Sequence, residues 1–250
     1  MLETINLSKS FYKSNIFKKD SKKNTVLDEL SFKVYPGDSI ALIGKNGAGK
    51  TTLLKTLSGL ITQDSGEIIL DRMTKLSSVN TNERSFFWRL TVFENLTFFS
   101  SFNKIDKNKI QEVLQIFNLE KKINSPYMHL SSGERKKVSI ARSLLKNANL
   151  LLFDEATSSL DIASKTVFIN TIKSLLDKNI ISAVIFSTHS LNEALTLSNK
   201  IIFIDNGKIV QQKPTSEFKT VDDLYNLYES WKPKKDKKHI HKRFADGKKL

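Results

Sequence analysis

The chain has 250 residues, a formal net charge of +14 at pH 7, and no cysteine. With 39% hydrophobic and 26% charged residues, the composition is typical of one large globular domain or two small ones. The absence of cysteine excludes disulfides, thiolate zinc sites and cysteine nucleophiles, and no apolar run reaches the ~20 residues that a membrane-spanning helix needs.

Two segments carry most of the positive charge. Residues 9–23 contain six Lys and one Asp, and residues 232–250 contain nine Lys or Arg and two Asp, which leaves +2 for the rest of the chain. Such peripheral clusters do not make the continuous basic face of a nucleic-acid-binding protein, and solvated lysines explain them equally well. Residues 1–7 lack the basic and apolar regions of a signal peptide, so we expect none.

The first part of the chain is predicted to form antiparallel β-strands. Residues 2–7 and 30–34 alternate apolar and polar side chains well enough for two strands, and Pro36 and Gly37 end the second. We predict that the lysine-rich stretch 13–23 between them is the tip of a hairpin.

Residues 44–51 read G-K-N-G-A-G-K-T, a complete phosphate-binding loop between an apolar strand, 40–43, and a helix that begins near Lys50. Such a loop presents consecutive backbone N–H groups, and the next helix directs its positive N-terminus to the same place. Lys50 can reach the β- and γ-phosphate oxygens, and Thr51 can bind Mg²⁺. A glycine-rich turn before a helix is the alternative, which the flanking strand and helix disfavour.

A mostly helical segment, about 84–146, is predicted between the early and late strands. Apolar side chains at helical spacing cover 110–117, after a candidate N-cap at Asp106, and 138–145. Residues 130–134, L-S-S-G-E, precede the second of these helices, so serine, glycine and a helix N-terminus make a second candidate anion site. Taken alone, this pattern is better explained as an S-x-x-E capping box.

Two later apolar strands end in side chains that could do chemistry. The sequence L-L-L-F-D-E places Asp154 and Glu155 at the carboxyl end of a buried strand, the edge where a doubly wound sheet binds ligands. Asp154 is placed to hold Mg²⁺, and Glu155 to orient or deprotonate an attacking water. His189 follows the strand 183–186 and could donate to a γ-phosphate oxygen, although a lone histidine is more often structural.

The apolar runs 40–43, 150–153, 183–186 and 201–204 lack alternation, which is typical of strands buried on both faces of a parallel sheet. Helical patterns separate them, including one over 168–176. We therefore predict an α/β fold of the P-loop NTPase class. It has a central mostly parallel sheet, an N-terminal antiparallel β part and an inserted helical subdomain.

Over roughly residues 2–210, this set of motifs resembles the nucleotide-binding subunit of an ATP-binding cassette (ABC) transporter. Residues 44–52 are similar to the Walker A loop, 150–155 to Walker B with its catalytic glutamate, and 130–134 to the signature usually written L-S-G-G-Q. Residues 158–161 resemble the D-loop, and His189 resembles the switch histidine.

The resemblance implies site residues as well. Phe11 stands where the family places an aromatic ring against adenine, with Tyr12 as the next candidate. Glu155, His189 and Lys50 would act in hydrolysis. Nucleotide contacts would come from Phe11, Gly44, Asn46, Gly47, Ala48, Gly49, Lys50, Thr51, Thr52, Ser131 and Gly133, and metal contacts from Thr51, Asp154 and Glu83.

Three departures from the family pattern matter most for function. Ser132 stands where the signature usually has glycine, and Ala156 follows Glu155 where proline is common. Glu83 stands where the Q-loop usually has glutamine, with Asn82 as the next candidate. The stretch around Glu83, E-R-S-F-F-W-R-L-T, is similar to one in some exporter-type members, so we predict export.

ATP and Mg²⁺ are the cofactors that the family implies. A head-to-tail homodimer, or a heterodimer with a related ATPase, would hold each ATP between one Walker A loop and the partner's signature. The resemblance also implies an integral membrane permease subunit as a separate chain. The ATPase would be cytoplasmic and peripheral on the inner face of the cell membrane. Phe86, Phe87, Trp88 and Leu90 would help form the dock for that permease, unless they pack inside the helical insertion.

Two alternatives remain at this point. A soluble ABC-type ATPase acting on the ribosome or nucleic acid would fit the positive charge, although we expect no specific nucleic acid partner. A binding module that does not hydrolyse nucleotide is disfavoured by Lys50, Asp154, Glu155 and His189.

The C-terminal part is predicted to separate into a helix and a tail. Residues 220–231 suit an amphipathic helix after a T-x-x-D capping box, and its apolar face would dock on the cassette. We therefore place the ABC ATPase domain at 1–231. Residues 232–250 form a basic tail that we expect to be disordered and to contact anionic lipid.

Overall fold

The computed structural model describes residues 1–15, 18–79, 85–101, 107–158 and 160–230. The chain divides into two compact units, Met1–Thr215 and Ser216–Leu250. Within the described ranges, no helix combines the length and the apolar character needed to cross a membrane. The domain bounds of 1–231 and 232–250 stay a prediction.

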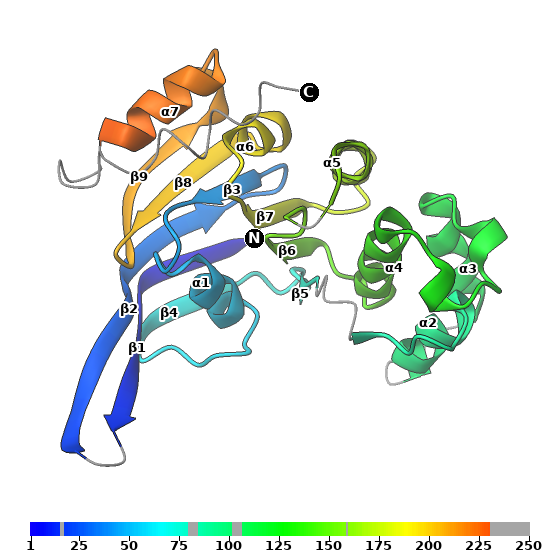
Figure 1. Ribbon diagram of the computed structural model, residues 1–250, viewed down its shortest axis with the longest axis horizontal. Coiled ribbons are helices and arrows are strands. Elements are labelled where there is room, and N and C mark those ends of the chain that lie inside the picture. The colour runs from blue at the N-terminus through cyan, green and yellow to red at the C-terminus, as the bar shows by residue number, and fades with distance from the viewer. Residues whose placement is uncertain (16–17, 80–84, 102–106, 159, 231–250) are drawn as a thin grey trace. The chain divides into compact units, whose positions relative to one another are not determined.

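The larger sheet has the strand order β5-β6-β7-β3-β8-β9 and is parallel except for β9. Strands β3 and β7 are buried along their whole length, which agrees with their unbroken apolar sequences. Because β3, β6 and β7 are parallel neighbours, their carboxyl ends meet at one edge of the sheet (Figure 1). The strands are β3 Ser39–Ile43, β5 Leu76–Ser78, β6 Leu150–Asp154, β7 Ala183–Ser187, β8 Lys200–Asp205 and β9 Lys208–Pro214.

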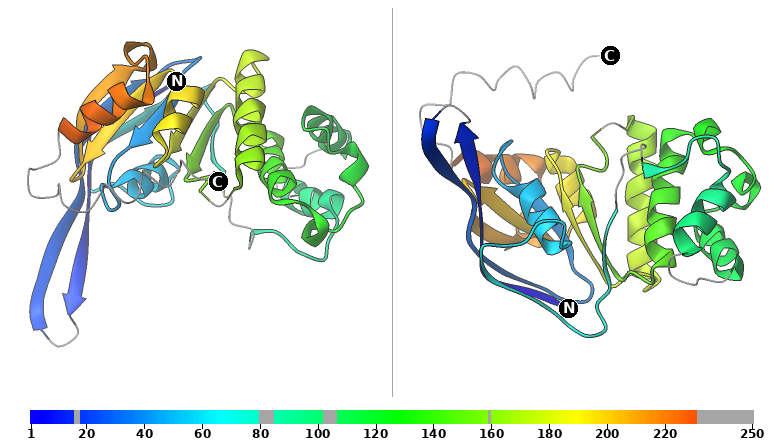
Figure 2. Two further views of the ribbon diagram at one scale, coloured as in Figure 1. Left: turned by 45° about the horizontal axis from the view of Figure 1, so that its top comes forward. Right: turned by 90° about the horizontal axis from the view of Figure 1, so that it is seen from below.

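The smaller sheet is antiparallel, with the order β2-β1-β4. Strands β1 (Leu2–Asn15) and β2 (Lys18–Val34) form a hairpin that extends beyond the other elements of its unit (Figure 2), and β4 spans Ser65–Leu70. The hairpin is the predicted one, but its strands are longer, because pairing continues to Lys13 opposite Lys22 and Asn15 opposite Lys18. The hydrogen bonds between paired strands join backbone groups and do not depend on the side chains. The polar residues at these strand ends therefore gave no apolar alternation from which the strands could be predicted.

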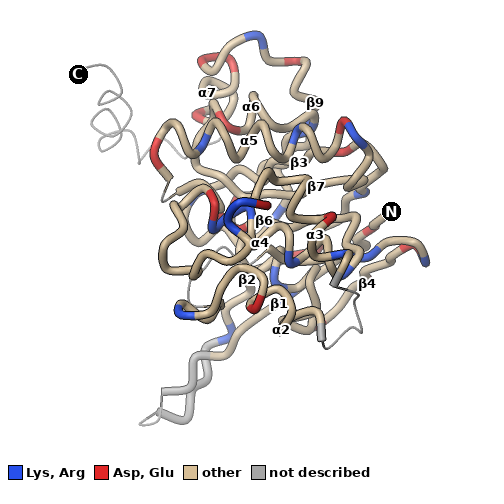
Figure 3. Tube along the Cα trace, turned by 90° about the vertical axis from the view of Figure 1, so that its right-hand side faces the viewer, with Lys and Arg blue, Asp and Glu red and all other residues tan. Residues whose placement is uncertain are grey.

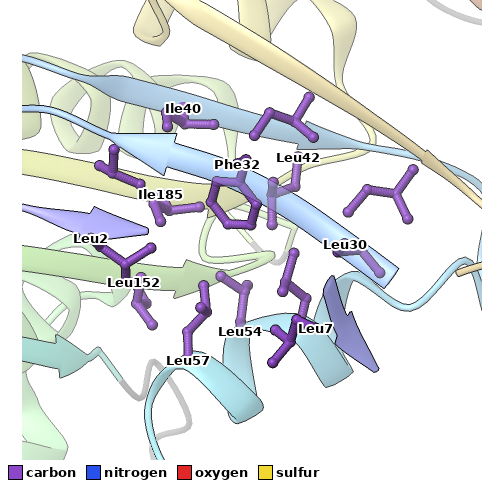
Figure 4. Packing of buried hydrophobic residues seen from close by; sticks show 14 of the residues in the cluster. Leu2, Leu7, Leu30, Phe32, Ile40, Leu42, Leu54, Leu57, Leu152 and Ile185 are labelled. Atoms are coloured by element: carbon purple, nitrogen blue, oxygen red, sulfur yellow. The ribbon is translucent and has the colours of Figure 1, made fainter. Parts of the chain in front are cut away.

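One hydrophobic core joins both sheets to helix α1, which spans Lys50–Leu57. Figure 4 shows Leu54 and Leu57 of α1 in the same cluster as Leu7 of β1 and Leu152 of β6. Burial of these side chains holds α1 against the sheets. Its N-terminus is thereby kept at the carboxyl end of β3, where the glycine-rich loop lies.

The helical insertion lies between β5 and β6, as predicted. The helices expected over 110–117, 138–145 and 168–176 are present, whereas the candidate N-cap Asp106 lies outside the described residues. Helix α2 falls within the predicted helical stretch, whereas sequence patterns did not predict α6, β4, β5 or β9. The helices are α2 Val92–Ser101, α3 Lys107–Ile116, α4 Ser132–Leu145, α5 Ile162–Asp177 and α6 Leu191–Leu197, with short 3-10 helices at Glu120–Lys122, Tyr127–His129 and Thr215–Glu217.

The second unit contains helix α7, Val221–Ser230. Its predicted capping box is present: the Asp223 N–H donates to Thr220 Oγ1 at 3.1 Å, and the Thr220 N–H donates to Asp223 Oδ2 at 2.8 Å. Docking of this helix on the cassette stays a prediction, and Trp231 lies outside the described residues.

Candidate active site

The phosphate-binding loop has a backbone that requires glycine. Gly47 and Gly49 have φ of +81° and +107°, in the left-handed region that other residues rarely adopt. A Cβ on Gly44 would collide with the backbone oxygen of Ile204, and one on Gly49 would lie 2.7 Å from the backbone oxygen of Val26. The loop therefore lies against β8 and β2 in a conformation that larger residues could not share.

The loop and α1 fit a polyphosphate. Gly49 is the N-cap of α1 and offers no side-chain hydrogen bond, and the first turn of the helix has no acidic residue. The N–H groups of that turn and the positive end of the helix dipole therefore remain suited to an anion. A cavity of about 560 Å³ adjoins the loop, and its lining includes Asn46, Gly47 and Thr51.

Lys50 is held inside the loop. Its side chain is buried, and Nζ donates to the carbonyl oxygens of Gly44 at 2.7 Å and Lys45 at 3.0 Å. Burial lowers the pKa of Lys50, against the opposing effect of the Glu155 and Asp154 carboxylates. The predicted phosphate-binding ammonium is thus close to both acids and already satisfied by the loop's carbonyl groups.

Asp154 and Glu155 lie at the carboxyl end of β6, as predicted. In the sheet, Asp154 pairs with Ser187 at the end of β7. Ser187 Oγ donates to Asp154 Oδ1 at 2.7 Å and accepts the Glu155 N–H at 2.9 Å. Sequence reasoning did not assign Ser187 to the site, because only the strand register places it opposite Asp154.

Glu155 and His189 are hydrogen-bonded to each other. Nε2 of His189 lies 2.7 Å from Oε1 of Glu155, and both side chains line the cavity beside the phosphate-binding loop. Glu155 has φ of +47°, an uncommon conformation for a residue with a Cβ and one that surrounding contacts must maintain. The structure therefore brings together the two side chains that the sequence predicts for hydrolysis.

Two of the predicted metal ligands, Thr51 and Asp154, line cavities that both include Glu155. Thr51 lines the cavity beside the loop, whereas Asp154 lines a neighbouring cavity of about 720 Å³. Glu155 lines both. A hydroxyl and a carboxylate are oxygen donors of the kind that Mg²⁺ prefers, so these two residues fit the ion. Glu83 and Asn82 lie outside the described residues, and the Glu83 assignment stays a prediction.

The strand register favours Phe11 over Tyr12 as the aromatic residue for adenine. Phe11 pairs with Asn24 of β2, which lines the cavity, whereas Tyr12 pairs with Lys23. Residues directly opposite each other in an antiparallel pair project to the same face, and neighbours along a strand project to opposite faces. Phe11 is 42% exposed, which leaves it accessible to a base.

The signature residues are not part of the lining of this cavity. Neither Ser131 nor Gly133 is among the described residues that line it. Ser131 is the N-cap of α4, where its Oγ accepts the Glu134 N–H at 3.2 Å and Glu134 Oε2 accepts the Ser131 N–H at 2.8 Å. The capping box suggested by the sequence is thus present. The Ser131 hydroxyl proton is not used by that bond and can still donate to an anion.

Residues 86–90, which contain three aromatic side chains, are partly buried and partly exposed. Phe86 is buried and stacks on Tyr127 at 4.6 Å between ring centroids, so it is not part of an exposed dock. Phe87 and Trp88 are exposed, at 47% and 43%, and Leu90 is half-buried. The alternative of packing inside the helical insertion therefore applies to Phe86, whereas Phe87 and Trp88 stay candidates for the dock.

The ABC transporter family model matches residues 27–158, just over half of the chain. The chain belongs to the ABC transporter family. Curated relatives of this ABC protein include spermidine/putrescine import ATP-binding proteins PotA of Haemophilus influenzae, 31% identical over 223 residues, and of Mannheimia succiniciproducens, 33% identical over 222. Each match covers 84% of this chain and 59% of the relative, so the chain spans little more than half of their length.

Solved ABC structures share the fold. The post-hydrolysis dimer of the cassette MJ0796, bound to ADP and Pi, aligns with a TM-score of 0.70 at 22% identity, covering 86% of this chain and 99% of that one. The cbiO1 protein of Clostridium perfringens, part of the cbiONQ transporter complex, aligns with a TM-score of 0.75 at 20% identity, covering 92% and 93%. The predicted family and fold class are confirmed.

Two finer expectations gain no support. The curated relatives are named as import proteins, so the comparisons do not support export. They also do not favour the alternative of an ATPase acting on the ribosome or nucleic acid.

Proposed function

We propose that this ABC protein binds and hydrolyses Mg²⁺-bound ATP and thereby powers transport through a separate membrane permease. The observation that carries the proposal is the 2.7 Å contact between Glu155 and His189 in a cavity also lined by Lys50 and the phosphate-binding loop. Family membership supplies the transport context. The hydrolytic role of these residues is our inference from their chemistry.

Each residue has a distinct role in the proposed reaction. The loop N–H groups and Lys50 bind the phosphates, and Phe11 stacks on the base. Glu155 accepts a proton from the attacking water, while His189 holds its carboxylate in orientation and can donate to a phosphate oxygen. Thr51 and Asp154 would hold Mg²⁺, which when bound neutralises developing negative charge on the phosphates.

The position of the signature supports a dimer. Ser131 and Gly133 do not line the cavity of their own chain, so they are available to complete the phosphate site of a second copy or of a related ATPase. In this arrangement ATP joins two subunits and hydrolysis releases them. We place the dimer on the cytoplasmic face of the membrane, bound to its permease. The named relatives favour import over the export direction.

Glu155→Gln tests the proposal. The amide keeps the size of the side chain but cannot accept the proton, so steady-state ATP hydrolysis should fall by about 10²–10⁴-fold while equilibrium ATP binding persists. The variant should also accumulate as an ATP-bound dimer in size-exclusion chromatography. The matched control is Glu67→Gln, at an exposed position of β4, which should hydrolyse ATP like wild type. Wild-type hydrolysis by Glu155→Gln would show that the base is misassigned.

A further inference from the structure

Glu193 is a buried carboxylate for which the reaction proposed above has no use. It lies on α6 and is only 8% exposed. Two threonine hydroxyls donate to its Oε2 atom, Thr157 Oγ1 at 2.8 Å and Thr188 Oγ1 at 2.6 Å. A buried carboxylate is costly unless it is hydrogen-bonded, so this bridge is a specific structural feature.

The local sequence predicts a different use for this side chain. Ser190 and Glu193 have the S-x-x-E spacing of a capping box, and Ser190 Oγ does accept the Glu193 N–H at 3.3 Å. In a complete box the glutamate would accept the Ser190 N–H, as Glu134 accepts that of Ser131. Here the Ser190 N–H donates to Thr188 Oγ1 at 3.0 Å instead. Glu193 therefore does not accept the Ser190 N–H, and its carboxylate accepts hydrogen bonds from the two threonines instead.

The two threonines flank the proposed hydrolytic pair. Thr157 follows Glu155 by two residues, in the turn after β6, and Thr188 immediately precedes His189 at the end of β7. The Thr188 N–H also donates to the carbonyl oxygen of Leu42, two residues before the phosphate-binding loop. The Glu193 bridge therefore ties the turn of Glu155 to the loop of His189, with a connection to β3.

The turn at Glu155 needs such a tie. Its φ of +47° is unfavourable by itself and persists only where neighbouring contacts hold it. Ser187 Oγ accepts the Glu155 N–H, and the hydrogen bond from Thr157 to Glu193 holds the chain two residues later. Both Glu155 and His189 are partly exposed, so the backbone of their loops largely determines where their side chains meet.

We propose that Glu193 is a positioning residue that, through Thr157 and Thr188, holds Glu155 and His189 in the geometry needed for ATP hydrolysis. The inference rests on the proposed function and adds a residue to it. Glu193 touches neither nucleotide nor water in this scheme. Its loss should therefore lower kcat, whereas KM for ATP, which reports on the phosphate-binding loop, should change little.

The primary test is Glu193→Leu in the full chain, compared with Glu193→Gln. Leucine leaves both threonine hydroxyls without their acceptor, so kcat should fall about 10–100-fold, the scale of an ångström-sized misplacement. Glutamine keeps an oxygen that can accept both hydroxyls and should retain most activity. Glu94→Leu is the control, because Glu94 has the same T/S-x-x-E spacing at the start of α2, caps that helix and lies outside the site. It should hydrolyse ATP like wild type.

A double-mutant cycle separates positioning from general weakening of the fold. In single-turnover hydrolysis, Glu193→Leu should have a much smaller effect in a Glu155→Gln background, because one of the two side chains that it positions can no longer accept the proton. An equal loss in both backgrounds would overturn the inference, as would wild-type kcat for a folded Glu193→Leu protein.

Thr157 provides a milder test if Glu193→Leu does not fold, as judged by circular dichroism. Thr157→Val removes the hydroxyl at nearly constant shape and should lower kcat, whereas Thr157→Ser retains the hydroxyl and should restore it. Equal activity of the two variants would overturn the inference. These outcomes differ from failure of the proposed function itself, which would appear as wild-type hydrolysis by Glu155→Gln.

Discussion

At the scale of single residues, Glu134 shows how a departure from the family signature is accommodated. It stands where the signature usually has glutamine, and its added charge lies at the N-terminus of α4. Oε1 lies 3.5 Å from Lys122 Nζ, and Oε2 accepts the Ser131 N–H. Although partial burial acts to raise it, the hydrogen bonds of Ser131 and the charge of Lys122 hold the pKa of Glu134 below its ordinary value. The carboxylate thus stabilises the helix start in its charged form.

This predicts a pH-dependent contribution to stability. A carboxyl group whose pKa is lower in the folded state stabilises the protein above its unfolded-state pKa of about 4.3, and the effect is lost as pH falls through the folded-state value. Glu134→Gln keeps an acceptor for Ser131 but removes the charge. Near pH 7 it should lower the free energy of unfolding by about 0.3–1 kcal/mol.

Urea denaturation at a series of pH values measures this difference. The gap between wild type and Glu134→Gln should close as the pH approaches 3, while the exposed control Glu67→Gln should show no such trend. A gap of constant size down to pH 3 would mean that the charge of Glu134 contributes nothing.

At the scale of elements, the segment before α2 is held by side-chain hydrogen bonds while it exposes aromatic rings. Asn95 of α2 accepts the Phe87 N–H and donates to the Phe87 and Leu90 carbonyl oxygens. The Trp88 ring lies 4.8 Å from the Arg135 guanidinium of α4, measured to the ring centroid. Phe98 of α2 is also exposed, at 41%, and lies edge-on to Phe87. A partly exposed aromatic surface with a hydrogen-bonded backbone suits a protein partner.

We therefore predict that Trp88→Ala weakens assembly with the permease. The isolated chain should stay folded, because Trp88 is 43% exposed and its loss removes peripheral contacts, namely a cation–π contact with Arg135 of about 0.5–1 kcal/mol and an edge-on contact with Tyr127. Co-purification of tagged chain and permease from detergent-solubilised membranes measures assembly. Met73→Ala is the control, since Met73 is an apolar residue that is 80% exposed elsewhere. Unfolding of the Trp88 variant would instead indicate that the segment serves only internal packing.

At the scale of the whole molecule, the positive charge is concentrated rather than uniform. Basic and acidic positions are interspersed over the described elements (Figure 3), whereas residues 232–250 contain nine Lys or Arg and two Asp. A subunit bound beneath a permease lies close to anionic lipid. Each basic residue near such a surface can contribute about 1 kcal/mol, and the attraction fades beyond a Debye length of roughly 8 Å.

Deletion of residues 233–250 should therefore reduce binding to anionic liposomes at low salt and leave the ATPase activity of the isolated chain intact. Liposome co-sedimentation measures the binding, with neutral phosphatidylcholine vesicles for comparison. A second variant that replaces the tail's Lys and Arg by Gln keeps the length and removes the charge, and it should behave like the deletion. If the full chain and both variants sediment equally, the tail has no role at the membrane.

The sequence by itself determined the features that contiguous residues encode. The phosphate-binding loop, the apolar strands and the capping boxes at Ser131 and Thr220 depend on neighbours within a few positions, so their patterns can be read directly. The acids after β6 and the histidine after β7 could be assigned to one edge because parallel strands end together.

Only the tertiary structure decided the contacts between residues far apart in the chain. Ser187 meets Asp154, and Phe11 rather than Tyr12 shares a face with Asn24, because strand register sets these pairs. Strand β9 and the ends of the β1–β2 hairpin are held by backbone hydrogen bonds, which polar sequences support as well as apolar ones. Glu193 has a capping-box sequence, which predicts that it accepts the Ser190 N–H. In the structure Thr188 Oγ1 accepts that N–H, and Glu193 instead bridges two loops.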